Sequence, residues 1–261
     1  MNTPEIRTVN VTRYVTPLRE GGSLPAIVEA DDDFLYVIKF RGAGQGKKAL
    51  ISELIGGELA RAMGLKVPEL VFMNLDSSFS STEPDEEIQD LLKFSTGLNL
   101  GLHYLSGAIT YDPIVSVADA LTASKVVLLD SMIMNVDRTW RNTNMLNWNR
   151  ELWLIDHGAS LYFHHTWDKW REYAEASFPA IKNHVLMIRA TMLEAAVEEI
   201  KKTITEETIR AIVSVIPDDF LEEDDHSPEE RKNVYAEFLN TKLANIDRLT
   251  REAADARKAG I

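Results

Sequence analysis

The sequence predicts an α+β protein with a small β-rich first part that carries one helix, followed by a mainly helical remainder. Two observations support this fold class. Before residue 76, short apolar segments have the length and alternation of strands. From about Ser116 onward, longer apolar segments with helix-capping residues predominate. The segment from 76 to 89 between these parts is polar and acidic, which is typical of a linker or mobile loop.

Bulk composition limits the classes of function. The 261 residues can bury a sizeable core, either as one domain of two lobes or as two small domains. A formal charge of −13 argues against direct nucleic-acid binding, because nucleic-acid-binding proteins neutralise phosphates with a basic face. The chain has no cysteine, which excludes disulfides, thiol catalysis and cysteine-bound zinc. Without a signal-peptide core or a long apolar run, we expect a soluble, cytoplasmic protein with no membrane partner.

The first forty residues predict three strands. They are expected over residues 5–15, 26–30 and 34–40. A turn that contains Gly21, Gly22 and Ser23 joins the first two strands, and such a turn can place backbone N–H groups over phosphates. An ordinary hairpin turn is the simpler interpretation when the turn is considered alone.

Lys39 lies near the end of the third, apolar strand. A lysine in this setting needs a partner or a cleft, because burial of an unpaired ammonium is costly. The alternative is a strand-end lysine that extends to water. The glycines between Arg41 and Lys48 match neither a Rossmann fingerprint nor a Walker A loop, because Arg and Lys occupy positions that require glycine.

A helix is predicted from about Ala49 to Met63, with Gly64 as its end. Glu53 shares a face of this helix with small residues, namely Gly56, Gly57 and Ala60. Another segment can approach this face closely, so we expect Glu53 to contact a neighbour. A solvated surface glutamate is the alternative. A further strand is predicted over residues 67–75.

The segment from Met134 to Leu161 holds the main candidate site. Two short strands turned at Asn149-Arg150 should bring Asp137, Asn142 and Asp156 to one edge. A cluster of oxygen ligands of this kind suits Mg²⁺ bound to a polyphosphate. In phosphoryl transfer, one aspartate accepts the proton of the attacking hydroxyl, while an asparagine and a second aspartate hold the metal.

Helices are predicted on both sides of this segment. The helix before it begins near Ser116 and Asp119, which we expect to act as an N-cap pair, and leads directly into Asp137. The helices after it are expected over residues 180–202, 206–216 and 228–257, with Thr205 capping the second and a Ser227–Glu230 capping box opening the third. The adjacent His164 and His165 are expected on an extended stretch, where they would face opposite ways rather than share a metal.

The Asp137-Arg138-x-x-x-Asn142 run, the Asp156-His157-Gly158 turn and the segment ELIGGELARAMGLKVPE resemble the HipA family of kinases. This resemblance implies a two-lobed protein-kinase-like fold, distantly akin to phosphatidylinositol 3- and 4-kinases. It implies an N-lobe over residues 1–75, a linker over 76–100 and a helical C-lobe over 101–261. The segment that crosses between the lobes would contact adenine around Met73, Asn74 and Leu75.

The resemblance also implies an activity, with ATP and Mg as cofactors. Lys39, held by Glu53, would contact the phosphates, Asn142 and Asp156 would bind Mg²⁺, and Asp137 would act as the base. The leading acceptor is a Ser or Thr of a protein substrate, including the kinase itself. A lipid or small-molecule hydroxyl is an alternative, suggested by Asp137-Arg138. The third possibility is a pseudokinase that binds ATP or a partner without chemistry.

Overall fold

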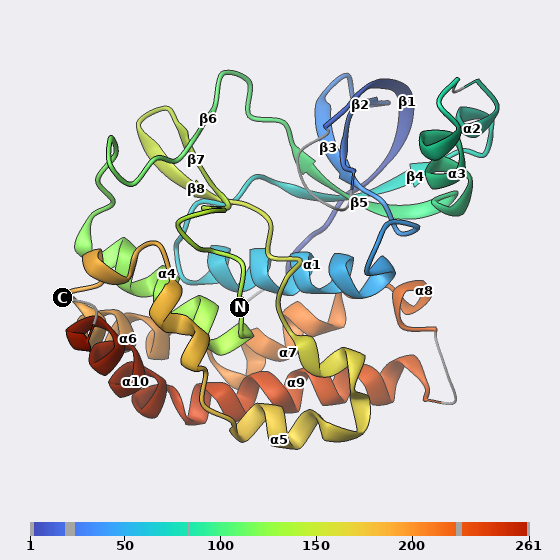
Figure 1. The fold of residues 1–261 in the computed structure, drawn as a ribbon. Coiled ribbons are helices and arrows are strands. Elements are labelled where there is room, and N and C mark those ends of the chain that lie inside the picture. Colours follow the sequence, from blue (N-terminus) through green and yellow to red (C-terminus); the bar gives the residue numbers. More distant parts are fainter. Residues whose placement is uncertain (1–2, 19–23, 83, 223–225, 260–261) are drawn as a thin grey trace.

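The computed structural model describes residues 3–18, 24–82, 84–222 and 226–259. A closed five-stranded barrel lies at one end of the molecule, and helices make up most of the opposite side (Figure 1). Helix α1 (Gly46–Ala62) runs between them. The predicted glycine turn at Gly21, Gly22 and Ser23 lies outside the described residues.

The barrel contains the three strands predicted at the start of the chain. Its strands are β1 (Thr8–Pro17), β2 (Ala26–Ala30), β3 (Leu35–Lys39), β4 (Leu70–Leu75) and β5 (Gly97–His103), in the order β1-β2-β3-β5-β4. Strands β1 and β4 pair in parallel, and the other neighbours are antiparallel. Tyr36 and Ile38 belong to the buried cluster inside the barrel. Successive side chains of a strand face opposite ways, so Lys39 faces outward.

Helix α1 packs against the outside of the barrel. Its buried residues form one cluster with Phe72, Leu100 and Leu102 of the barrel strands and with the apolar residues of the helical part. The helix begins three residues before the predicted start and is followed by Gly64 at φ 76°. A positive φ of this size favours glycine, so the predicted helix end is confirmed.

The linker expected over residues 76–100 is wrong. The segment forms α2 (Ser78–Thr82), α3 (Glu86–Phe94) and strand β5, which pairs with both β3 and β4. The acidic composition that indicated a linker instead begins a helix, because the Asp85 side chain accepts the backbone N–H groups of residues 87 and 88. Ile88 and Leu92, four residues apart, are buried against the barrel core. The chain therefore leaves the barrel after β5 and not after Leu75.

The hairpin at the centre of the sequence is confirmed. Strands β7 (Met145–Trp148) and β8 (Glu151–Leu154) pair around Asn149 and Arg150, whose φ angles are 50° and 65°. Two successive positive φ values are those of a tight hairpin turn. A short strand β6 (Ile109–Thr110) adds to the edge of β7. The hairpin holds together the two loops that carry the predicted site residues.

Helix α4 (Ala120–Ile133) precedes the first of these loops. Its N-cap is Asp119, whose side chain accepts the N–H of Thr122 at 2.9 Å. Ser116 is not part of the cap, since its hydroxyl accepts a hydrogen bond from Asn147. The helix ends at Met134 in a left-handed conformation, with φ 56°, which turns the chain into the loop of Asp137.

The remaining helices are shorter than predicted. They are η1 (Tyr162–His165), η2 (Trp167–Lys169), α5 (Trp170–Glu175), η3 (Pro179–Asn183), η4 (Met187–Arg189), α6 (Leu193–Thr203), α7 (Glu206–Ser214), α8 (Asp218–Leu221), α9 (Pro228–Ala244) and α10 (Ile246–Ala259). The Thr205 cap of α7 and the Ser227–Glu230 capping box of α9 are confirmed.

Three expectations for this region are wrong. The single helix over residues 180–202 is replaced by two 3₁₀ turns and α6. The helix over 228–257 is interrupted at Asn245, the C-cap of α9, whose side-chain amide donates to the carbonyl of Thr241 at 2.9 Å. His164 and His165 lie in a 3₁₀ helix, and the buried His164 pairs with the Tyr235 hydroxyl at 3.0 Å. No helix within the described ranges is long and apolar enough to cross a membrane.

Candidate active site

Lys39 and Glu53 form a buried ion pair between strand β3 and helix α1. Lys39 Nζ lies 2.6 Å from Glu53 Oε2, and the Glu53 side chain is 0% exposed. Burial alone would lower the pKa of Lys39, but the charges of Glu53 and Asp156 outweigh it and raise this pKa above its usual value. The Lys39 charge likewise lowers the pKa of Glu53 despite burial. Both groups are therefore charged at neutral pH, and Glu53 contacts the neighbour that its small-residue face predicted.

Asp156 completes a three-residue cluster with this pair. Its Oδ1 atom lies 2.7 Å from Lys39 Nζ, and its side chain is 47% exposed. The residue adopts a left-handed backbone conformation, with φ 55°, directly after strand β8. A side chain from the front third of the chain and one from its middle therefore meet at a partly open position, as the kinase interpretation requires.

His157 anchors the Asp156 loop to helix α1. Its backbone N–H donates to Glu53 Oε2 at 2.7 Å, so one carboxylate oxygen serves both Lys39 and the loop. The His157 side chain is fully buried against the helix at Gly56. A Cβ atom at residue 56 would lie only 2.6 Å from the His157 Cβ. The small-residue face of the helix thus makes room for the loop that carries Asp156.

We expect Gly56→Ala to destabilise the protein by about 1–3 kcal/mol, because overpacking outweighs the roughly 1 kcal/mol gain in helix propensity. The atom that must move is attached to the His157 backbone, so the Asp156 loop moves with it. Gly57→Ala is the matched control, since its new Cβ meets the flexible end of Leu70. Urea unfolding of both variants measures the difference, and equal stability of the two would contradict this account.

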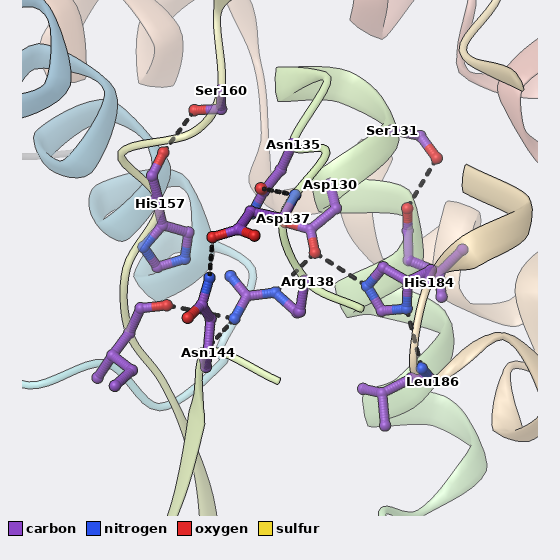
Figure 2. A network of polar contacts seen from close by, with 12 residues as sticks. Asp130, Ser131, Asn135, Asp137, Arg138, Asn144, His157, Ser160, His184 and Leu186 are labelled. Atoms are coloured by element: carbon purple, nitrogen blue, oxygen red, sulfur yellow. Dashed lines mark hydrogen bonds and ion pairs between the residues drawn. The ribbon is translucent and has the colours of Figure 1, made fainter. Parts of the chain in front are cut away.

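Asp137 lies in the loop between α4 and β7, where two asparagines contact its carboxylate. Asn142 donates to Asp137 Oδ2 at 2.7 Å, and Asn144 donates to the same atom at 3.1 Å (Figure 2). The structure thus brings Asn142 to Asp137, as the sequence predicts. Within the described residues, Asp137 contacts the two asparagines and Asp156 contacts Lys39, and no hydrogen bond joins the two aspartates directly.

Asn144 is a site residue that the sequence analysis missed. It is buried, precedes β7 directly and has φ 48°, a conformation in which asparagine is favoured. Its carbonyl accepts the N–H of Ile155 at 3.1 Å, which places it beside the residue before Asp156. The only sequence signal was a second asparagine two positions after Asn142 and next to an apolar strand.

Oxygen atoms dominate the groups that could hold a cation here. Asp156 and the carbonyl oxygens of the two asparagine side chains are hard ligands that suit Mg²⁺ or Mn²⁺. The described ranges contain no group of three or more His, Cys, Asp or Glu residues able to hold a metal ion. The donor set therefore fits a cation that takes its remaining ligands from a bound phosphate and from water, as Mg²⁺ usually does.

Met73, Asn74 and Leu75, the predicted adenine contact, lie on strand β4 of the barrel, and the chain does not cross to the helical part directly after them. Met73 and Leu75 belong to the core inside the barrel, where Met73 fills the space beside Gly101. Asn74 is exposed and donates to the side chain of Asn10 at 3.1 Å. The crossing expected after Leu75 is wrong, because α2, α3 and β5 intervene before the chain leaves the barrel.

The sequence model of the family described as HipA-like kinase matches residues 11–250. The fold is similar to that of the Helicobacter pylori proinflammatory kinase CtkA, with a TM-score of 0.53, 13% identity, and coverage of 97% of this chain and 99% of that one. It is also similar to the Golgi casein kinase with Mn/ADP bound, with a TM-score of 0.52, 11% identity, and coverage of 100% of this chain and 75% of that one. No curated protein matches the chain in sequence.

Proposed function

The chain belongs to the family of HipA-like kinases, and from this premise we propose that it transfers the γ-phosphate of ATP to a Ser or Thr hydroxyl of a protein in an Mg²⁺-dependent reaction. The observation that carries the proposal is the position of Lys39 Nζ, which contacts Glu53 at 2.6 Å and Asp156 at 2.7 Å. In kinases a lysine–glutamate pair and a metal-binding aspartate must both be in place for transfer.

We propose two lobes with the nucleotide between them. The first lobe comprises the barrel and α1, and it extends to the end of β5 at His103. The second comprises the remaining helices and the β6–β7–β8 sheet. The adenine ring would contact the backbone that follows β5, around Tyr104 and Leu105, since this segment joins the lobes. Support comes from the topology, in which β5 is the last barrel strand before the hairpin and the helices.

Each site residue has a proposed role. Lys39 orients the phosphates and Glu53 orients Lys39, while Asp137 accepts the proton of the attacking hydroxyl. Asp156 and Asn142 would hold Mg²⁺, and Asn144 is placed to assist them. The metal, when bound, neutralises charge on the phosphates. Because phosphoryl transfer depends mainly on positioning and on charge stabilisation, these few side chains account for the chemistry that the protein itself supplies.

Saturation with Mg²⁺ and ATP should stabilise the folded protein. At a ligand concentration of 100 times Kd, the expected gain is about 2.7 kcal/mol. Differential scanning fluorimetry with MgATP and with MgGTP would measure the gain and its nucleotide preference. A melting temperature that stays constant over millimolar MgATP would contradict nucleotide binding at this site.

Incubation with γ-labelled ATP tests the acceptor. We expect label on Ser or Thr of proteins from a cell lysate, and on the kinase itself when it is incubated alone. Label that appears only in the lipid or small-molecule fraction would overturn the protein acceptor and leave the kinase assignment in place. ATP binding without transfer to any fraction would make the protein a pseudokinase.

A further inference from the structure

Asp130 is a buried carboxylate in the last turn of helix α4, and three side chains donate to it. Arg138 Nε donates to Oδ2 at 2.7 Å and His184 Nε2 donates to the same oxygen at 2.9 Å. Asn135 Nδ2 donates to Oδ1 at 3.2 Å (Figure 2). Burial would raise the pKa of Asp130, but the Arg138 charge and the His184 hydrogen bond lower it, so the carboxylate stays ionised.

One connection runs from Asp130 to the backbone of Asp137. Asn135 donates to Asp130 through its amide and accepts the N–H of Asp137 on its Oδ1 atom at 3.0 Å. The backbone N–H of Asn135 also donates to the carbonyl of Asp130 at 2.9 Å. One buried side chain therefore fixes the position of the Asp137 backbone relative to the helix (Figure 2).

A second connection runs from Asp130 to the carboxylate of Asp137. The Arg138 side chain, which is 0% exposed, is held by Asp130 at Nε and donates through Nη1 to the carbonyl of Asn144. The Asn144 amide then donates to Asp137 Oδ2 at 3.1 Å. Arg138 Nη1 also lies 3.3 Å from the carbonyl of Ile155, the residue before Asp156. The same guanidinium thus contacts the residue before β7 and the residue after β8, and the latter directly precedes Asp156.

A third connection ties in the segment around His184. His184 Nδ1 accepts the N–H of Leu186 at 3.0 Å, so the ring proton lies on Nε2, which donates to Asp130. The N–H of Val185 donates to the carbonyl of Arg138 at 3.1 Å. A neutral imidazole is consistent with burial, which lowers the pKa of His184. Asp130 therefore links the loop that follows its own helix to the segment around His184, which is 54 residues away in sequence.

We propose that Asp130 is a positioning residue for phosphoryl transfer, which fixes the backbone of Asp137 through Asn135 and its carboxylate through Arg138 and Asn144. The inference rests on the proposed function of Asp137 as the base. A buried ion pair is weak evidence for stability by itself, because well-packed apolar residues can serve equally well. Both connections from Asp130 end at Asp137, so we infer that the Asp130–Arg138 pair serves to position Asp137. Such positioning matters because a small displacement of a reacting group lowers the rate by a large factor.

The test is a double-mutant cycle between Asp130→Asn and Asp137→Asn, measured below the melting temperature of every variant. We expect Asp130→Asn to lower kcat by about 10–100-fold, with KM for ATP within about threefold of wild type. In the Asp137→Asn background the same substitution should cost less than about threefold, because no base remains to be positioned. If Asp130 only stabilises the structure, Asp130→Asn should lower kcat by the same factor in both backgrounds.

Two further variants distinguish a displaced Asp137 from a general loss of folding. Asn135→Ala removes one connection but keeps Asp130 paired with Arg138 and His184, so it replaces Asp130→Asn in the cycle if the latter does not fold. Ser131→Ala is the matched control, because Ser131 is the buried neighbour of Asp130 and its hydroxyl donates to the carbonyl of Val127 instead. This control should keep wild-type kcat.

Amide hydrogen exchange gives a readout that needs no activity. Asp130→Asn and Asn135→Ala should accelerate exchange of the Asp137 amide at least about fivefold, and Ser131→Ala should leave it unchanged. The positioning role would be overturned if the Asp137 amide exchanged at the wild-type rate in the first two variants. It would also be overturned if Asp130→Asn lowered kcat by the same factor with and without Asp137→Asn. Normal wild-type transfer in that case would leave the kinase proposal standing. A wild-type protein that transfers no phosphate would overturn both proposals.

Discussion

Replacing Asp137 with asparagine is expected to lower the rate of phosphate transfer by a factor of about 10²–10⁴, the range that a general base contributes. The amide has nearly the shape of the carboxylate but cannot accept the proton of an attacking hydroxyl. Its carbonyl oxygen can still accept the hydrogen bonds that Asn142 and Asn144 donate to Asp137 Oδ2. We therefore expect the stability and the affinity for MgADP to stay near the wild-type values.

Single-turnover transfer of labelled phosphate, together with calorimetric titration of MgADP, measures both quantities. The matched control is Asp168→Asn, which changes an exposed aspartate of η2 in the same way. Transfer at the wild-type rate by Asp137→Asn would remove this residue from the role of base. Loss of MgADP affinity in parallel with transfer would show instead that the substitution damages the nucleotide site.

Replacing Lys39 with methionine should remove phosphate transfer almost completely and also destabilise the fold. The variant loses the cation that would contact the phosphates, for which we expect a fall in kcat/KM of about 10²–10³. It also leaves Glu53 buried without its counter-charge. Breaking a buried pair by removal of one partner typically costs about 3–5 kcal/mol. Two effects of different origin are therefore combined in one variant.

The double variant Lys39→Met/Glu53→Gln separates these effects. Glutamine removes the uncompensated charge and still presents an oxygen to the N–H of His157, which donates to Glu53 in the native protein. We expect the double variant to recover most of the stability in urea unfolding but none of the transfer activity. Recovery of activity together with stability would mean that Lys39 acts only in folding.

Residues with strong local signals were predicted well from the sequence. The turn at Asn149 and Arg150, the end of α1 at Gly64 and the capping box at Ser227 each depend on a few neighbouring residues. The contact of Glu53 was predictable for a related reason, because the small residues around it leave room for a partner.

Residues whose roles depend on distant contacts were predicted poorly. The acidic composition of residues 76–89 gave no sign that Ile88 and Leu92 would pack against the core of the barrel. In the sequence, Asp130 is one polar residue within an apolar helix. Its partner His184 lies 54 residues away and contacts it only in the folded protein. Asn144 was overlooked because Asn142 has the expected spacing, whereas burial beside β7 distinguishes Asn144.

Lys39 contacts two carboxylates at once, and this arrangement affects whether a proposed nucleotide ligand would bind with or without a metal ion. One ammonium lies between two carboxylates, those of Glu53 and Asp156, so this corner of the protein carries an excess of negative charge. A bare triphosphate would be repelled there. If a divalent cation were bound by Asp156 together with a nucleotide, its positive charge would offset the carboxylates and leave the Lys39 amine available to phosphate oxygens. Under the proposed function, we therefore expect the metal-chelated nucleotide to bind more tightly than the free anion.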